Sequence, residues 1–198
     1  MAEHCAFCTV HFALNEMWRK RYKKVDETER VVKDVERSRE KTMNRAVKLL
    51  AAKPRSIGEL RERLLEKLWT NEAIVDAVIE KLKEYKYLDD EQYAQDLAVS
   101  KLRQKPQGKH RLRQSMSQKK LDKETMEAAI ENAFEKLPED ELIAQAIEKR
   151  IRLKGMPTTR EDLKKFYDHL LRQGFGFDLV RESLSAIVRN KIDQSGDE

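Results

Sequence analysis

The sequence of 198 residues has few of the residues that interrupt or crosslink helices, with six glycines, four prolines and two cysteines. Two cysteines, Cys5 and Cys8, cannot staple a fold of this size, which fits a reducing compartment. Alternating runs of β-branched or aromatic residues are also scarce, whereas apolar residues three and four positions apart recur nearly throughout. The sequence therefore predicts an all-α protein.

Long apolar segments are missing too. No window approaches 18 consecutive apolar residues, and the N-terminus carries Glu3 without the basic start of a signal peptide. We therefore expect a soluble, cytoplasmic protein with no membrane contact. With 39% apolar and 39% charged residues, the chain should fold, but not around one thick core.

Acidic residues are absent from residues 101–120, although the chain contains 36 of them. The formal net charge is +5, and the sequence outside this stretch sums to −3, so the basic character is local. We predict that the basic side chains of the stretch form the binding surface of the protein. They are Lys101, Arg103, Lys105, Lys109, Arg111, Arg113, Lys119 and Lys120.

Pro106 and Gly108 interrupt this stretch, so we expect one helix to end before them and another to begin after them. Cations at the end of a helix complement its dipole, whereas cations at the start of a helix oppose it. The unfavourable position of the cations that begin the second helix suggests that they are needed for binding. Such groups attract phosphates by counterion release and acidic protein surfaces by complementarity. A merely solvated basic face is the alternative interpretation. The first group is Lys101, Arg103 and Lys105, and the second is Lys109, Arg111 and Arg113.

An internal repeat organises the chain. Two helix faces of its first copy fall on apolar residues again at a shift of 52 residues, and once more at a shift of about 103. In the third copy, a three-residue insertion containing Gly174 and Gly176 separates the two faces. The first face comprises Leu60, Leu64 and Leu68, then Leu112 and Met116, then Leu163, Tyr167 and Leu171. The second comprises Ile74, Val78 and Leu82, then Met126, Ile130 and Phe134, then Val180, Leu184 and Val188.

A proline stands just ahead of each copy, and a further helix precedes each proline, which gives nine helices in three units of three. These additional helices cover roughly 42–52, 89–104 and 139–154. Units of about 50 residues cannot bury all their apolar faces alone, so we expect three tandem three-helix repeats that form an elongated, curved helical body. The predicted organisation is a charged N-terminal extension over 1–41 that is partly helical or disordered, repeats over 42–88, 89–137 and 138–192, and a polar tail over 193–198.

Helix caps explain several polar clusters. Ser56 and Glu59 have the spacing of a capping box, and Thr70 or Asn71 can cap the next helix. Asp89 and its acidic neighbours lie where a further helix begins, so we interpret them as caps and not as a catalytic carboxylate cluster.

Nothing in the sequence indicates catalysis or a metal site. It contains no P-loop and no Gly-x-Gly-x-x-Gly motif. His4, Cys5, Cys8 and His11 carry the right donor atoms for Zn²⁺, but so compact a set lacks the second knuckle or helix that closes a tetrahedral site. An apolar leader is the favoured interpretation of this end. We predict that the protein is not an enzyme and that it holds no metal and no cofactor.

Four aromatic side chains offer a choice between packing and base stacking. They are Tyr85, Tyr87, Tyr93 and Phe134. Their spacing favours packing in the core or between units over stacking on nucleic-acid bases.

Two segments resemble the RecX family of recombinase regulators, namely SIGELRERLLEKLWTNEAIVDAVIEKLKEYKYLDDEQYAQDLAVSKL (56–102) and GKHRLRQSMSQKKLDKETMEAAI (108–130). The resemblance spans about residues 44–190. Its features are the Glu59-Leu60-Arg61 start, the Tyr87-Leu88-Asp89-Asp90 turn, and Gly108 followed by Arg111-Leu112 and Lys119. Where the family usually has glycine before this turn, the chain has Lys86, and where the family tends to have Lys-Gly before an apolar residue, the chain has Lys119-Lys120-Leu121.

The resemblance implies a non-enzymatic modulator of RecA, built from three tandem three-helix repeats, that lies in the helical groove of the RecA–DNA filament. Such a protein inhibits RecA ATPase and strand exchange and thereby modulates DNA repair. Its implied partners are the RecA filament and, through phosphate contacts, single-stranded DNA, and we expect it to act as a monomer. The residues alone leave two alternatives open, a helix-turn-helix-like DNA-binding protein and a helical interaction scaffold without nucleic-acid contact.

Overall fold

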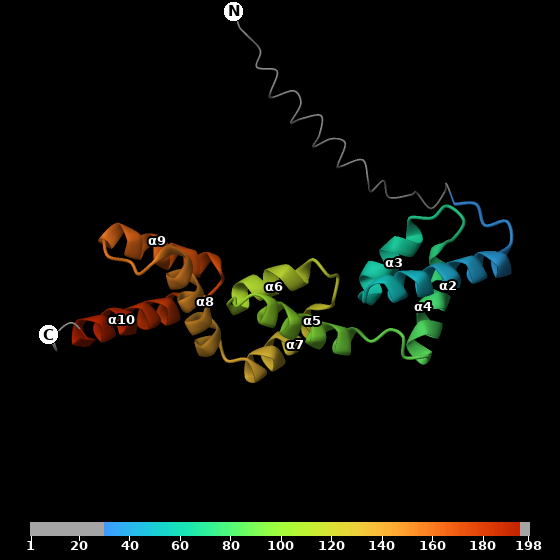
Figure 1. The fold of residues 1–198 in the computed structure, drawn as a ribbon. Helices are drawn as coiled ribbons and strands as arrows, with labels where there is room; N and C mark the ends of the chain where they lie inside the picture. Colours follow the sequence, from blue (N-terminus) through green and yellow to red (C-terminus); the bar gives the residue numbers. More distant parts are fainter. Residues whose placement is uncertain (1–29, 195–198) are drawn as a thin grey trace, which may run out of the picture. The chain divides into compact units, whose positions relative to one another are not determined.

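The computed structural model describes residues 30–194, with side chains as far as residue 186, and all regular structure in that part is helical (Figure 1). The all-α prediction is confirmed. The helices fall into two compact units: unit 1 contains residues as far as Lys53 together with Glu59–Tyr87, and unit 2 contains Pro54–Gly58 together with the chain from Leu88 onwards. Within the described part, no helix is both long enough and apolar enough to cross a membrane.

Three helices belong to unit 1: α2 (Val35–Ala52), α3 (Ile57–Leu65, without its first two residues) and α4 (Glu72–Glu84). Their apolar faces meet in a core made of Ala46, Leu60, Leu64, Ile74, Val75, Val78, Ile79 and Leu82. The prediction that Leu68 continues the first face is wrong, since its side chain is 52% exposed. Because α3 ends at Leu65, the helical period no longer holds at residue 68.

The first described helix begins at Val35, well before the predicted start near residue 42. The carboxylate of Asp34 accepts a hydrogen bond from the backbone N–H of Arg37 at 3.1 Å, which satisfies a donor that the helix itself leaves unpaired. The charged stretch before residue 42 is therefore helical from Val35. Residues 1–29, which include Cys5 and Cys8, lie outside the described part of the chain.

Thr70 and Asn71 have different roles at the start of α4. Asn71 is the cap, because its side chain accepts from the backbone N–H of Ile74 at 2.9 Å. The hydroxyl of Thr70 is instead fully buried and lies 3.0 Å from the hydroxyl of Thr42 on α2, which itself donates to the carbonyl of Ser38. The buried hydroxyls of Thr42 and Thr70 are thus both paired.

Six helices belong to unit 2: α5 (Asp90–Gln104), α6 (Lys109–Ser117), α7 (Lys123–Lys136), α8 (Glu139–Lys154), α9 (Arg160–Arg172) and α10 (Phe177–Gln194). Asp89 caps α5, because its carboxylate accepts from the backbone N–H of Gln92 at 2.9 Å. The predicted helices over 89–104 and 139–154 agree with α5 and α8.

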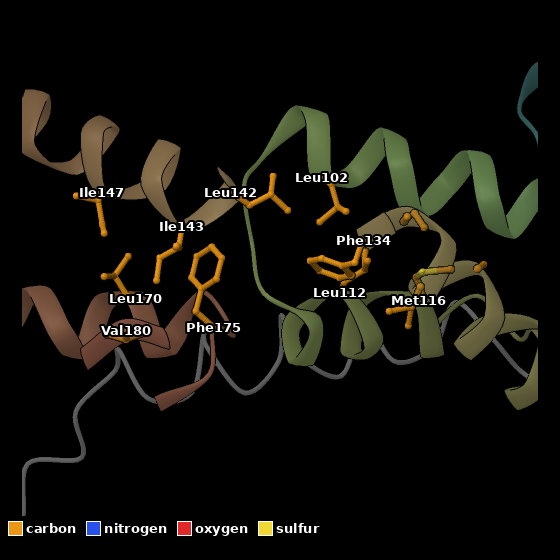
Figure 2. Close-up of a cluster of buried hydrophobic side chains, with 14 of the residues drawn as sticks. Leu102, Leu112, Met116, Phe134, Leu142, Ile143, Ile147, Leu170, Phe175 and Val180 are labelled. Atoms are coloured by element: carbon orange, nitrogen blue, oxygen red, sulfur yellow. The ribbon is translucent and has the colours of Figure 1, made fainter. Parts of the chain in front are cut away.

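The core of unit 2 is continuous from α5 to α10. In Figure 2, Leu142 lies between a group of side chains from α5, α6 and α7 and a second group from α8, α9, α10 and the loop before α10. Leu142 is 2% exposed, so it joins the two groups without an intervening solvent layer. The first group includes Leu102, Leu112, Met116 and Phe134, and the second includes Ile143, Ile147, Leu170, Phe175 and Val180.

The third copy of the repeat follows a different offset from the predicted one. Its buried residues on α9 are Phe166 and Leu170, whereas the predicted Tyr167 and Leu171 are only partly buried. Phe166 and Leu170 stand 106 positions after Leu60 and Leu64, and Val180 and Leu184 stand 106 positions after Ile74 and Val78. A single offset therefore relates both apolar faces of the third copy to those of the first. The extra residues come before α9 and do not separate the two faces of the copy. Val188 lies beyond the described side chains.

The packing prediction for the aromatic residues is right for Phe134, which is 8% exposed, and wrong for Tyr85 and Tyr87, which are 58% and 69% exposed. Tyr85 is the C-cap residue of α4, and Tyr87 follows a left-handed residue, so neither continues the apolar face of the helix. Tyr93, on α5, is partly buried.

Two lysines adopt a left-handed backbone conformation, Lys86 with a φ of 56° and Lys120 with a φ of 55°. Both stand where the resemblance to the RecX family places glycine. In each case the lysine follows a helix and turns the chain, a conformation that glycine adopts without the steric penalty of a Cβ. The turns are thus retained although the glycines are not.

A recurring contact fixes the turn after the second helix of each copy. The carbonyls of Lys67, Lys119 and Gln173, which are equivalent under the offsets of 52 and 106, each accept a hydrogen bond from a segment earlier in the chain. The donors are Arg30 Nη1 in unit 1, and the Ser56 hydroxyl and the Gly108 backbone N–H in unit 2. The contact therefore recurs as regularly as the apolar faces do.

Candidate functional site

The acid-free stretch forms the corner between α5 and α6 in unit 2. Lys101 and Arg103 lie in the last turn of α5 and Lys105 is its C-cap, while Lys109 begins α6 directly after the N-cap residue Gly108. Cations at the end of α5 complement its dipole, and the first turn of α6 contains no acidic residue. The structure therefore agrees with the predicted ends of the two helices.

Gly108 gives this corner its close approach to the turn after α9. Its N–H donates to the carbonyl of Gln173 at 3.0 Å, and a Cβ added at Gly108 would lie 2.1 Å from the carbonyl oxygen of Gly174. Position 174 also requires glycine, because its φ is 87°. A Cβ at Gly174 would in addition lie 2.5 Å from the backbone nitrogen of Arg111. Two glycines thus let the two backbones touch.

The basic side chains of the stretch differ in exposure. Arg103, Lys105, Lys109, Arg113 and Lys120 are exposed, whereas Lys101, Arg111 and Lys119 are half-buried. Arg103 also lines a groove of about 540 Å³ along α5 together with polar residues that include Gln92, Gln104 and Lys136. Most of the predicted surface is therefore open to a partner.

Lys109 is held at the corner by two contacts. Its Nζ lies 5.5 Å from the ring centroid of Phe134, within cation–π distance. Its backbone N–H donates to Oε1 of Glu139 at 3.2 Å, which places a carboxylate beside the start of α6. Ile57, the equivalent residue of the first copy, likewise donates its N–H to a carboxylate, that of Asp90, at 2.9 Å.

Arg113 already has a partner. Its guanidinium binds both carboxylate oxygens of Glu127 on α7, at 2.5 Å and 2.6 Å. Because Arg113 donates these hydrogen bonds and adds its positive charge, the pKa of Glu127 lies below the usual range. Arg113 would therefore meet a second anion while it is bound to its first.

Lys119 and Lys120 belong to the turn after α6 and not to the corner. The carbonyl of Lys119 accepts from the hydroxyl of Ser56, and a Cβ at Gly58 would lie 2.6 Å from the carbonyl of Lys120. The structure therefore separates these two lysines from the other six cations and gives their backbone a part in packing within unit 2.

A set of cations that the sequence did not reveal lies beside Arg111. Nη1 of Arg111 donates to the carbonyl of Arg172 at the end of α9, at 2.8 Å. Arg150 on α8 lies with its guanidinium carbon 5.1 Å from the ring centroid of Phe166 and donates to the carbonyl of Lys165 at 3.2 Å. These contacts place the guanidinium groups of Arg111 and Arg150 against α9, the helix that also carries Arg172.

His169 lies among these cations. Burial, followed by the positive charges of Arg150, Arg172, Lys105 and Arg111, lowers the pKa of its imidazole below the usual range. Its Nε2 lies 3.5 Å from Nε2 of Gln173, a residue that is 8% exposed and whose Oε1 is buried without a hydrogen-bond partner. The repeat contains a signal for this arrangement. With an offset of 106 for the third copy, Gln173 is equivalent to Lys119, and the preceding residue, Arg172, is placed in the same turn.

The described residues contain no group of three or more His, Cys, Asp or Glu side chains arranged to hold a metal ion. The four candidate zinc ligands of the sequence, from His4 to His11, lie outside the described residues. The interpretation of that end as an apolar leader stays a prediction.

Comparison with known proteins adds a second line of observation. A family model described as "RecX, first three-helix domain" matches residues 43–82, and one described as "RecX, second three-helix domain" matches residues 89–130. A "Regulatory protein RecX" of Prosthecochloris aestuarii is 30% identical over 76% of this chain and 95% of its own length, and one of Chlorobium phaeobacteroides is 30% identical over the same shares. The crystal structure of RecX from Lactobacillus salivarius has a TM-score of 0.66 at 22% identity and covers 75% of this chain and 96% of that one.

Proposed function

Since the chain belongs to the RecX family of regulatory proteins, which are regulators and not enzymes, we propose that it binds the RecA–DNA filament and inhibits RecA ATPase and strand exchange. By doing so it modulates homologous recombination and DNA repair. We expect it to act as a monomer in the cytoplasm.

One observation carries the proposed binding mode, namely the basic corner between α5 and α6, where an acid-free stretch of the sequence lies on the surface. A filament of RecA on DNA is a polyanion, and cations gain affinity for it by releasing its counterions. The proposed contacts are made by the basic side chains predicted from the sequence, which are Lys101, Arg103, Lys105, Lys109, Arg111, Arg113, Lys119 and Lys120. The bond between Arg113 and Glu127 supports a smaller contribution from Arg113.

The test is RecA ATPase on single-stranded DNA with sub-stoichiometric amounts of this protein. The wild type should lower the ATPase rate, and a triple variant Lys101→Gln, Arg103→Gln, Lys105→Gln should inhibit less at equal concentration. These side chains form no ion pairs among the described residues, so their replacement should leave the fold unchanged.

The matched control removes three positive charges from α2 and its C-cap, through Lys41→Gln, Lys48→Gln and Lys53→Gln. This variant should inhibit as the wild type does. No inhibition by folded wild-type protein would contradict the proposed function, and equal inhibition by both triple variants would contradict the proposed surface. If about half of the eight cations touch single-stranded DNA, the slope of log K against log salt should be roughly −3.

A further inference from the structure

Four cations around His169 come from four separate elements of unit 2, and we refer to them as the cationic cluster. Lys105 is the C-cap of α5, and Arg111, Arg150 and Arg172 belong to α6, α8 and α9. Among the described residues, no carboxylate lies within ion-pair distance of any of the four. The four positive charges are therefore not neutralised by ion pairs within the described part of the protein.

Contacts with α9 fix two of the four cations. Arg111 is anchored to the last carbonyl of α9, and Arg150 is fixed by the ring of Phe166 and the carbonyl of Lys165. Contact between Gly108 and Gly174 sets the distance between α6 and α9. Because these two arginine side chains are already ordered, they lose less entropy when a ligand binds.

We propose that the cationic cluster binds the phosphodiester backbone of single-stranded DNA, and that His169 takes up a proton when it does so. This rests on the proposed function only in its choice of DNA as the polyanion. Guanidinium groups match the geometry of phosphate oxygens.

The proton follows from the charges that face His169. All the charged groups that act on the imidazole are cations, so without a ligand they disfavour its protonated form. A bound phosphate neutralises these cations and favours the imidazolium, which takes its proton from solvent. Affinity for DNA should then rise as the pH falls through the range in which His169 titrates, up to roughly tenfold for each unit by which the phosphate raises the pKa of His169.

Gln173 provides the partner for the added proton. In the structure its side-chain nitrogen faces His169 Nε2, and its buried Oε1 lacks a hydrogen-bond partner. A neutral imidazole accepts at Nε2, whereas an imidazolium donates there. Rotation of the Gln173 amide by half a turn would let Oε1 accept that proton and would pair an otherwise unsatisfied buried atom.

The experiment measures fluorescence anisotropy of a labelled oligothymidine with the full chain, so that RecA is absent and base sequence plays no part. The double variant Arg150→Gln, Arg172→Gln should bind about tenfold more weakly and reduce the slope of log K against log salt by about 1.4, the value for two lost phosphate contacts. The control Lys149→Gln, Lys164→Gln removes the same charge from the same two helices and should bind much as the wild type does.

Proton uptake is tested by repeating the titration between pH 7.5 and pH 5.5. Affinity should rise toward low pH in the wild type and in His110→Gln, and should lose most of this rise in His169→Gln. His110 is a suitable control because it is exposed near the same corner. An equal rise in His169→Gln and His110→Gln would overturn the role of His169.

Two other outcomes would overturn the DNA site. In the first, both double variants bind oligothymidine equally. In the second, Arg150→Gln, Arg172→Gln keeps its affinity for oligothymidine but loses inhibition of RecA, which would assign the cluster to an acidic protein surface. Normal DNA binding by a wild type that fails to inhibit RecA would instead contradict the proposed function and leave the site standing. The helical content of each variant is checked by circular dichroism, so that a loss of binding is not mistaken for a loss of folding.

Discussion

The contact between Gly108 and Gly174 allows a sharp test, because the two backbones leave no room for a side chain. A Cβ at Gly108 would lie 2.1 Å from the carbonyl oxygen of Gly174, 2.3 Å from its carbonyl carbon and 2.4 Å from the nitrogen of Phe175. Ordinary contacts begin near 3.4 Å, so Gly108→Ala must separate α6 from the turn after α9 by about 1 Å.

The expected loss of stability has two parts. Forcing extra atoms into packed structure costs about 1–3 kcal/mol, and these neighbours are backbone atoms that cannot rotate aside. Separation also breaks the hydrogen bond from Gly108 N–H to the carbonyl of Gln173, which contributes about 1 kcal/mol. We therefore expect Gly108→Ala to lower the free energy of unfolding of unit 2 by about 2–4 kcal/mol.

The assay is urea unfolding followed by circular dichroism at 222 nm, with Gly176→Ala as the control. A Cβ at Gly176 would meet nothing within 4 Å, and this glycine does not have a positive φ, so Gly176→Ala should be neutral or slightly stabilising. If Gly108→Ala unfolded within about 0.5 kcal/mol of the wild type, the close approach of the two backbones would be refuted.

Two further predictions concern stability. Lys86→Gly and Lys120→Gly should each raise the free energy of unfolding by about 1 kcal/mol in urea unfolding, because glycine adopts a positive φ without steric penalty. Glu127→Gln should lower it by about 0.5 kcal/mol at pH 7, by removing the partner of Arg113. Because the pKa of Glu127 is depressed in the folded state, this contribution is complete above about pH 4.5 and is lost as the pH falls through the folded-state pKa.

Controls exist for both predictions. Lys83→Gly, inside α4, should lower the free energy of unfolding by about 1 kcal/mol, the opposite sign to that of Lys86→Gly. A loss of stability in Lys86→Gly would therefore contradict the left-handed turn. The difference between wild type and Glu127→Gln should shrink between pH 6 and pH 3 in thermal unfolding, whereas Glu131→Gln on the same helix should show no such change. A constant difference would contradict the ion pair.

The helices were predictable because local signals agree with the packing. The spacing of Leu60, Leu64 and Ile74 identifies buried faces, and Asn71 and Asp89 stop the helices that they cap from extending backwards. Predictions failed where a helix ended. Leu68, for example, still fits a spacing of four but lies beyond the last turn of α3.

The candidate site was predictable only as far as one stretch of sequence reaches. Charge composition identifies the corner between α5 and α6, but it does not reveal that Arg113 is bound to Glu127 on the next helix. Arg150 and Arg172 have acidic residues near them in the sequence, so charge composition did not identify them as part of a basic surface. They join Arg111 only because backbones far apart in the chain meet, which a single sequence does not encode in any local pattern.

The backbone at the start of α6 has a last consequence. Helix N-termini often hold phosphates through free N–H groups, but here the N–H of Gly108 is bonded to Gln173 and that of Lys109 to Glu139. These two N–H groups are therefore not free to bind a phosphate, and the proposed contacts at this corner are made by guanidinium and ammonium groups. Such contacts set no fixed register along a strand, so a bound polymer could slide past the corner or be stretched without being released.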